Sequence, residues 1–361
     1  MVSLKTGIAD LPLHKGKCPP WLFLRMKKLV GSVAKIIVME YGQKELLRKL
    51  ADPFFFQALG CVCGYDWHSS GLTTTLTAAL REGVDKEIGI AVLGGKGRMS
   101  KTVPRELEEV AEYFSFSSST LEKLKECSRM SAKIDNVCVQ DGYSLYHHSF
   151  IVSEKGDWVV VQQGMNMENK YARRYHWFSA RVRGFVEEPH SGIAGEKREE
   201  KTLNMVSKEN AEARKAVVDL VKENPLNLRK YFVAPNSLLK YLRMQPEHTF
   251  DVKSYEKIVE IHEFDPKDFE ELVSLNNVGM KTIRALALMS HLIYGTPLSW
   301  KDPKIFSFAH GGKDGHPYPI NRRNYDKTLQ ILEDAVKNAE IGRKEKLRAL
   351  KKLKEILSLN K

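Results

Sequence analysis

The sequence of 361 residues has few cysteines and no long hydrophobic run. Its five cysteines are scattered and lack the paired CxxC spacing of a zinc site, so we expect neither a disulfide framework nor a structural zinc. No stretch approaches the roughly 18 uncharged residues that a membrane span requires. The first residues also lack the apolar core of a signal peptide. We therefore expect a cytoplasmic protein with no membrane partner.

Internal repeats and low-complexity tracts are also absent, and the composition of 42% hydrophobic and 28% charged residues is typical of a folded protein. The charge is unbalanced, with 57 Lys and Arg against 45 Asp and Glu and a formal net charge of +12. Residues 322–361 hold 12 basic and 6 acidic residues, which is half of that excess. Lys351 and Lys352 lie there on a predicted amphipathic helix. Such a charge fits an anionic partner, and nucleic acid is one candidate, which Lys351 and Lys352 would contact.

The first half of the chain mixes helix and strand patterns. Residues 143–152 and 158–163 are rich in β-branched and aromatic residues, and a turn-forming segment separates them, which predicts a β-hairpin. Residues 88–93 predict a short buried strand, whereas residues 165–180 have helical character. Further helices are expected at residues 21–50 and 106–125.

The composition changes most sharply between residues 191 and 215, where two glycines precede the charged run Glu196–Lys201. We expect a charged linker there. It would separate an α+β domain at residues 1–190, with a mixed sheet, a β-hairpin and helices, from a helical domain at residues 216–361. The predicted fold class is therefore α+β followed by all-α.

Residues 265–295 predict two helices joined by a tight turn. Asp265 is a good N-cap with Pro266 at the first helical position, the first helix ends near Ser274, and the second begins near Lys281. The segment resembles the helix-hairpin-helix family of DNA-binding motifs, in which N–H groups at the start of the second helix bind a phosphate. The resemblance implies DNA contacts from Asn277, Val278, Gly279, Lys281, Thr282 and Arg284.

Lys281 also fits a second interpretation. It occupies the position of the Schiff-base lysine in helix-hairpin-helix glycosylase/lyases similar to endonuclease III, and Asp302 matches their catalytic aspartate in a Gly-x-Pro-x4-Asp pattern. The spacing from Lys281 to Asp302 is longer than in that family, and no four-cysteine cluster follows. We therefore prefer phosphate contact for Lys281.

Several segments of the first domain are dense in His, Arg, Gln and Asp, which core packing does not require. Histidine carries protons or binds metals near neutral pH, and arginine binds phosphate oxygens. We expect a catalytic site there, in which Arg173, Arg174 and Gln163 hold the phosphate. Its candidate residues are Asp66, His68, His147, His148, Gln163, Arg173, Arg174 and His176. The alternative is that these side chains brace the fold through buried hydrogen bonds.

A divalent metal, Mg²⁺ or Mn²⁺, is the expected cofactor of that site. The hairpin with His147 and His148, followed by His176, loosely fits a ββα-metal nuclease, so these three histidines are the candidate ligands. Adjacent residues on a strand point to opposite faces, however, so His147 and His148 can share one ion only across a bulge.

Four long strings are similar to an archaeal and thermophile-bacterial family catalogued as domain of unknown function seven-six-three. They are Asp66-Trp-His-Ser-Ser-Gly71, Gln162-Gln-Gly-Met-Asn166, Ala172-Arg-Arg-Tyr-His-Trp177 and Phe306-Ser-Phe-Ala-His-Gly-Gly-Lys-Asp-Gly-His-Pro317. The resemblance covers nearly the full length and implies a DNA-associated protein with a nuclease role.

The expected function is that of a DNA-processing enzyme, a nuclease acting in DNA repair or replication. DNA is the expected partner, and repair or replication proteins are possible further partners. Two alternatives stay open: a glycosylase/AP lyase that uses Lys281 and Asp302, and a non-enzymatic DNA-binding or scaffold protein.

Overall fold

The computed structural model describes Leu11, Leu13 and residues 18–65, 69–195, 199, 202–226, 252–303 and 334, apart from the side chains of 252–255. Four of the predicted site residues lie outside this part: Asp66, His68, Lys351 and Lys352. The string from Phe306 to Pro317 also lies outside it. No helix in the described ranges is both long and apolar enough to cross a membrane.

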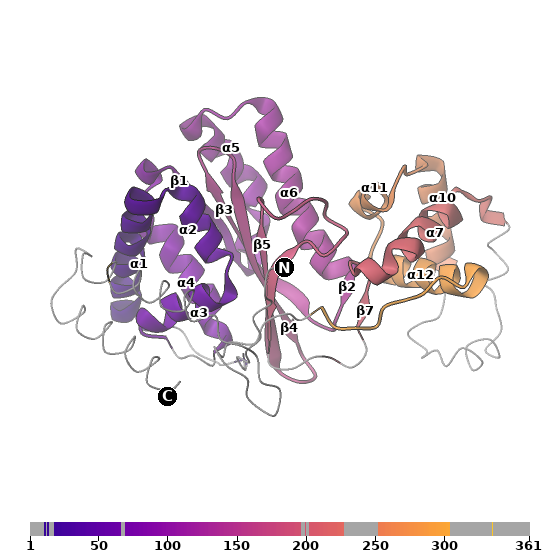
Figure 1. Ribbon diagram of the computed structural model, residues 1–361, viewed down its shortest axis with the longest axis horizontal. Helices are drawn as coiled ribbons and strands as arrows, with labels where there is room; N and C mark the ends of the chain where they lie inside the picture. The colour runs from indigo at the N-terminus through magenta and orange to yellow at the C-terminus, as the bar shows by residue number, and fades with distance from the viewer. Residues whose placement is uncertain are drawn as a thin grey trace.

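A five-stranded sheet in the order β1-β3-β4-β5-β6 forms the centre of the fold (Figure 1). Its strands are β1 (Ile90–Lys96), β3 (Ser144–Ser153), β4 (Trp158–Asn166), β5 (Tyr171–Phe178) and β6 (His190–Ala194). The predicted hairpin is confirmed as β3 and β4. The predicted mixed sheet is wrong, because all four pairings of this sheet are antiparallel. Short turns join β3 to β4 and β4 to β5, and such turns connect only antiparallel neighbours.

Strand β5 occupies the segment for which the sequence predicted a helix. Tyr175 and Trp177 pack into the core on one face, whereas the side chains of Arg174 and His176 bond to residues of the helical layer on the other face. Because both faces are covered, β5 lacks the apolar–polar alternation that marks a half-exposed strand in sequence. The polar residues at these buried positions account for the wrong prediction.

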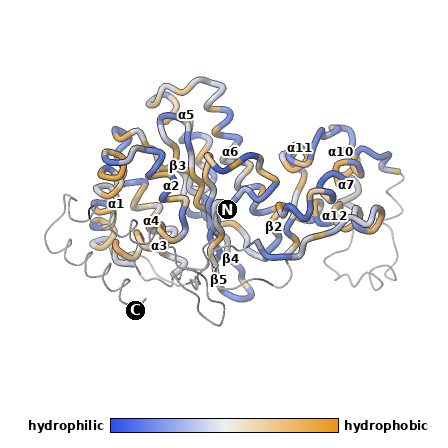
Figure 2. Tube along the Cα trace, in the orientation of Figure 1, coloured by the Kyte–Doolittle hydropathy of each residue, from blue (hydrophilic) through white to orange (hydrophobic). Residues whose placement is uncertain are grey.

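One face of the sheet is covered by the first four helices. Residues Ile151 and Val161 of the sheet share a hydrophobic core with them. Gly42, at φ +83°, separates the first two, so the helical prediction for residues 21–50 is confirmed as two helices. In Figure 2, hydrophobic and hydrophilic residues alternate along the first of them, as expected for a helix with one buried face. The helices are α1 (Pro20–Tyr41), α2 (Gln43–Leu50), α3 (Pro53–Val62) and α4 (Ser70–Gly83).

The opposite face is covered by α5 (Val103–Phe114) and α6 (Ser118–Val137). Phe150 and Val160, whose chain neighbours face α1–α4, point into this second core. Ser115, in the left-handed region with φ +56°, separates α5 from α6, and the prediction for residues 106–125 becomes two helices. Two helical layers therefore enclose the sheet, and both of its faces are buried.

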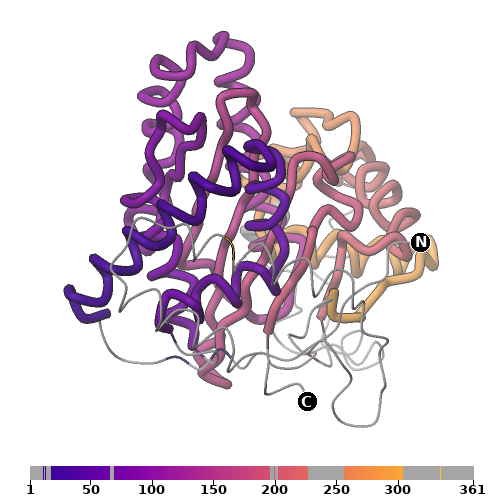
Figure 3. The backbone as a smooth tube through the Cα atoms, turned by 60° about the vertical axis from the view of Figure 1, so that its left-hand side comes forward, coloured from indigo at the N-terminus to yellow at the C-terminus, as the bar shows by residue number. Residues whose placement is uncertain are grey.

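The remaining helices lie beyond α6, away from α1 (Figures 1 and 3). Their apolar side chains belong to the same core as α6 and the adjacent sheet face. Most of the charged run Glu196–Lys201 lies outside the described residues. The described residues of the expected linker contribute most of β6, the strand β7 (Leu203–Asn204), which pairs with β2 (Val139–Gln140), and the start of α7. The helices are α7 (Ala211–Lys222), α10 (Val252–Phe264), α11 (Phe269–Ser274) and α12 (Met280–Tyr294).

Candidate functional site

The adjacent histidines of β3 point to opposite faces of the sheet. His147 bonds to Thr77 of α4, whereas His148 bonds to Ser128 of α6. The register does shift just before them, since Leu145 pairs with Gly164 and His147 with Gln163, leaving Tyr146 as an extra residue. This bulge does not bring the two imidazoles to one side. The three predicted ligands His147, His148 and His176 therefore do not converge on one ion.

The described ranges contain no group of three or more His, Cys, Asp or Glu residues that could hold a metal ion. Apart from His147 Nδ1, the ring nitrogens of His147, His148 and His176 instead contact hydroxyl, amide, guanidinium and carbonyl groups. The described residues thus do not fit the predicted metal, and no step of the chemistry below uses one.

On the α6 side of the sheet, four side chains form a hydrogen-bonded chain. Gln162 Nε2 donates to Asp135 Oδ2 (2.5 Å) and to the carbonyl of Ser131 (3.0 Å), so its Oε1 is left as an acceptor. His148 Nδ1 lies 2.8 Å from that Oε1 and must carry the proton. His148 Nε2 is then unprotonated and accepts from the Ser128 hydroxyl at 2.8 Å.

Asp135 is the anionic end of this chain and is completely buried. Besides Gln162, it accepts from Trp177 Nε1 at 3.0 Å and lies 2.5 Å from His190 Nε2. Three donors around one carboxylate compensate for its removal from water. Burial lowers the pKa of His148, with an opposing contribution from its bond to Gln162 and the charge of Asp135. His148 is therefore a neutral base at physiological pH.

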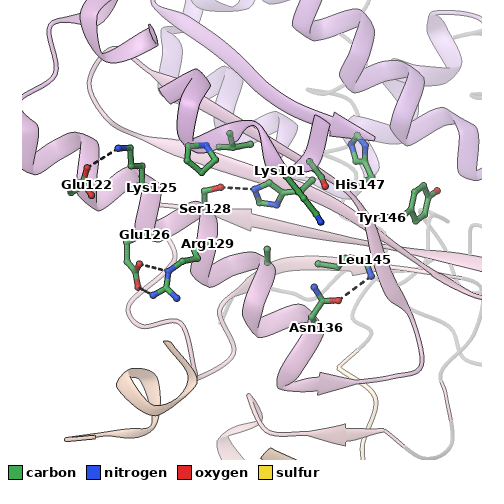
Figure 4. A pocket seen from close by; sticks show the side chains of 15 residues that line it. Lys101, Glu122, Lys125, Glu126, Ser128, Arg129, Asn136, Leu145, Tyr146 and His147 are labelled. Atoms are coloured by element: carbon green, nitrogen blue, oxygen red, sulfur yellow. Dashed lines mark hydrogen bonds and ion pairs between the residues drawn. The ribbon is translucent and has the colours of Figure 1, made fainter. Parts of the chain in front are cut away.

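The other end of the chain opens on a pocket of about 620 Å³ between α6, the start of β3 and the residues before α5. Ser128, His148 and Lys101 line it together with Lys125 and Arg129 of α6 (Figure 4). The segment after β1 contributes Lys101 from a short 3₁₀ helix (Gly97–Lys101). Of the predicted catalytic residues, His148 is thus the one whose imidazole joins a complete relay at this pocket.

His147 also lines this pocket, but its imidazole bonds to α4 on the other side of the sheet. Thr77 donates its hydroxyl proton to the carbonyl of Thr73 at 2.9 Å, so it accepts at 3.1 Å from His147 Nε2–H. His147 Nδ1 is buried without a hydrogen-bond partner, and protonating it would create an unpaired charge in the interior. Burial, with the nearby His148 and Lys96, lowers the pKa of His147 to about 3.

Arg174 and His176 also face α1–α4. Arg174 donates to His176 Nε2, to Thr73 Oγ1 and to Gln57 Oε1, and His176 Nδ1 donates to the carbonyl of Leu50. Burial and the guanidinium lower the pKa of His176 well below its ordinary value. Burial also lowers the pKa of Arg174 to about 9. These contacts join the sheet to α2, α3 and α4.

Arg173 points the other way and forms a buried ion cluster. Its guanidinium lies 2.9 Å from Asp141 and contacts both oxygens of Asp302, at 2.9 and 2.7 Å. Burial alone would lower the pKa of Arg173, but the two carboxylates hold it above its ordinary value. Tyr175 donates to Asp141 at 2.7 Å.

The predicted joint phosphate clamp of Arg173, Arg174 and Gln163 is therefore not supported. Arg173 and Arg174 lie on opposite faces, and Gln163 donates to the carbonyl of Ser70 and to the hydroxyl of Tyr146. Asp302, proposed as the partner of Lys281 in a lyase, holds Arg173 and the amide of Glu199 instead. A carboxylate engaged in this way in the interior is a structural counter-ion.

The hairpin expected at residues 265–295 is formed by α11 and α12. Asp268, and not Asp265, caps the first helix: its carboxylate accepts from Glu271 N at 2.8 Å. Asp265 follows α10 in a left-handed conformation with φ +51°, which Asp adopts more readily than most other non-glycine residues. The predicted end of α11 at Ser274 is confirmed, and the second helix begins at Met280.

The start of α12 is open. Gly279, the N-cap, has extended angles (φ −122°, ψ −178°), and no described residue lies within 4 Å of the place where a Cβ would stand. No side chain caps the helix, and no hydrogen bond to the amides of Met280, Lys281 or Thr282 is found among the residues that the structure describes. Lys281 is exposed, whereas Val278 and Thr282 are buried and fix the turn.

Helix α6 holds this hairpin against the sheet domain. Arg129 Nη1 donates to the carbonyl of Ser274 at 2.5 Å, and Lys133 donates to the carbonyl of Leu275. Burial and the neighbouring Arg129 lower the pKa of Lys133 to about 8. Arg129 also lines the pocket, so one side chain touches both the hairpin and the Ser128–His148 site.

Ser128 and Asp135, the two ends of the relay, were not among the site residues predicted from the sequence. A signal was present: Ser128, Ser131 and Asp135 recur at i, i+3 and i+7, among the buried apolar residues of the same helix. Polar residues on the core face of a helix need buried partners, and those partners lie on β3 and β4.

The chain matches the family described as "Protein of unknown function (DUF763)" over residues 7–320. No curated protein and no solved structure matches it significantly. The matched range includes the sheet, the polar residues on both of its faces and the helical hairpin. Since the match covers most of the chain, the protein belongs to this family.

Proposed function

We propose that this protein binds DNA through the α11–α12 hairpin and cleaves the phosphodiester backbone. The observation that carries the proposal is the open N-terminus of α12, where the amides of residues 280–282 and the exposed Lys281 surround free space at Gly279. The N-terminus of a helix attracts anions through these amides and the helix dipole. The net charge of +12 favours the same partner.

Backbone contact of this kind is independent of base sequence. Two polar contacts support a rigid hairpin: Gln140 donates to the carbonyl of Met280 at 3.0 Å, and Asn277 donates to Glu260 at 2.7 Å. A phosphate therefore meets prepositioned donors, and binding does not require the turn to become ordered first.

The sharpest test of binding replaces Gly279 with aspartate. An aspartate at this extended N-cap position can accept from the free amides, so the helix should be as stable as before or slightly more stable. The same carboxylate would occupy and repel the phosphate site. We expect Gly279→Asp to lower affinity for double-stranded DNA at least 10-fold in fluorescence anisotropy, with an unchanged melting temperature. Unchanged affinity would contradict the proposal.

Lys281→Gln should also weaken binding and reduce the slope of log K against log salt by about 1. Lys35→Gln is the matched control, because Lys35 is exposed on α1, at the far side of the molecule from α12 (Figure 1). It carries the same charge change without contact with the hairpin, so it should bind DNA with nearly wild-type affinity and salt dependence.

The cleavage half of the proposal is supported by the pocket beside α6, in which the neutral base His148 lies with the cations Lys101, Lys125 and Arg129. Arg129 places this pocket next to the hairpin. End-labelled single- and double-stranded DNA should be cut by the full chain, and reactions with EDTA or with added Mg²⁺ or Mn²⁺ measure any metal requirement. DNA binding without turnover under every condition would instead identify a non-enzymatic DNA-binding protein.

A further inference from the structure

We infer that Ser128 is the nucleophile of the proposed cleavage and that His148 is its general base. The substrate class in this inference, a phosphoric diester, rests on the proposed function. The labelling test below does not depend on that function. Ser128 Oγ lies 2.8 Å from His148 Nε2, and both side chains line the same pocket. This separation is within the range of nucleophile–base pairs in covalent catalysis.

The direction of each hydrogen bond favours this chemistry. Gln162 is fixed by its two donations, so His148 holds its proton on Nδ1 and directs the lone pair of Nε2 at Ser128. When His148 takes the serine proton, the positive charge on the imidazole is stabilised through Gln162 by the carboxylate of Asp135. Gln162 and Asp135 are positioning residues here.

The charges around the pocket select an anionic ester. Lys125 pairs with Glu108 and Glu122, and Arg129 pairs with Glu126, so carboxylates already balance these two cations. Lys101 is exposed, and no ion pair of its ammonium is found within the described ranges. It is the cation left to neutralise a non-bridging phosphate oxygen as charge grows on it in the transition state.

The step balances without a metal or a redox partner. Ser128 Oγ attacks phosphorus and its proton passes to His148 Nε2, while the bond from phosphorus to the leaving oxygen breaks. His148 returns the proton to that oxygen, which leaves as an alcohol and leaves a phosphodiester on Ser128. Water then attacks the phosphorus of this intermediate and gives a proton to His148. The bond from phosphorus to Ser128 Oγ breaks, Ser128 takes that proton from His148, and a phosphate monoester is released.

Covalent labelling tests the nucleophile directly. Diisopropyl fluorophosphate transfers its phosphoryl group to an activated serine and releases fluoride, whether or not the protein binds DNA. We expect the full chain to gain one diisopropylphosphoryl group, located on Ser128 by peptide mass spectrometry. His148→Gln should slow labelling at least 100-fold, as expected when a general base is removed.

Two serines provide matched controls. Ser100 lines the same pocket but donates to the carbonyl of Gly97, and Ser131 lies one turn along α6, where it donates to the carbonyl of Ser128. Ser100→Ala and Ser131→Ala should label like the wild type, and Ser128→Ala should not label while it keeps DNA affinity. If the folded wild type shows no adduct on Ser128, or the adduct is on Ser100, the inference is overturned. DNA affinity, measured separately, reports on the hairpin alone.

Discussion

The three buried histidines of the sheet are each held as a neutral tautomer by a different partner. His148 and His176 carry their proton on Nδ1, which donates to Gln162 and to the carbonyl of Leu50. His147 carries it on Nε2, which donates to Thr77. Burial lowers the pKa of all three. The folded protein therefore resists protonation at positions that an unfolded chain would protonate near pH 6.5.

This difference predicts acid lability. A histidine with a folded pKa of about 3 contributes stability that is complete above about pH 6.5 and is lost as the pH falls toward 3. Between pH 7 and pH 5, His147 alone should account for about 2 kcal/mol of lost unfolding free energy. In urea titrations at the two pH values, His147→Gln should lose about 2 kcal/mol less than the wild type. An equal loss would show that His147 takes up a proton in the folded protein as readily as in the unfolded chain.

The sequence predicted the chemistry of single residues better than their grouping. His148 was selected as catalytic and does lie at a pocket, but the partners that orient it, Gln162 and Asp135, are 14 and 13 residues away on other elements. Strand parity alone separates His147 from His148, and that constraint can be read from their adjacency in the sequence. The register of β4 and β5 decides which side chains of the two strands are neighbours, and it depends on contacts between residues far apart in the chain.

At the scale of elements, helix α6 connects all parts of the candidate site. Its buried face carries Ser128 and Asp135, and its exposed side carries Arg129, which reaches the end of α11. The hairpin β3–β4 and the helical segments at residues 21–50 and 106–125 were predictable, because turn residues and helical periodicity are local signals. Strand β5 was not, because polar residues that are satisfied only by tertiary contacts interrupt its pattern.

The bond from Arg129 to Ser274 should stabilise the hairpin locally. Loss of one such bond costs about 1 kcal/mol, which is about a fivefold change in local opening. Hydrogen exchange of the amides in α11 and the following turn should therefore be about five times faster in Arg129→Met. Lys123→Met, a substitution at an exposed position of the same helix, is the control and should leave exchange there unchanged. Equal exchange in both variants would contradict the role assigned to Arg129.

At the scale of the whole molecule, the helices after residue 210 share one hydrophobic core with α6 and the sheet. Leu286 of α12, Ile134 of α6 and Tyr175 of β5 are members of the same cluster of buried residues. The buried pair of Arg173 and Asp302 adds a polar connection between β5 and the segment after α12. Such contacts favour cooperative unfolding over two independent domains.

Leu286→Ala tests this cooperativity. The side chain is fully buried, so its truncation should cost about 3 kcal/mol. If the core is shared, exchange of the amides of β4 and β5 should accelerate together with that of α12, although both strands lie outside the helical segment. Faster exchange in α7 and α12 with unchanged protection in the sheet would show that residues 216–303 unfold as a separate domain.

The opposite orientations of His147 and His148 also bear on how β3 finds its place during folding. Slippage of β3 by one residue against β4 would still pair apolar side chains with apolar side chains, since Phe150–Val152 lie opposite Trp158–Val160. It would, however, turn each histidine toward the wrong helical layer and leave its nitrogens without acceptors or donors. The polar residues in the middle of the sheet thus discriminate against misaligned hairpins that hydrophobicity alone would tolerate.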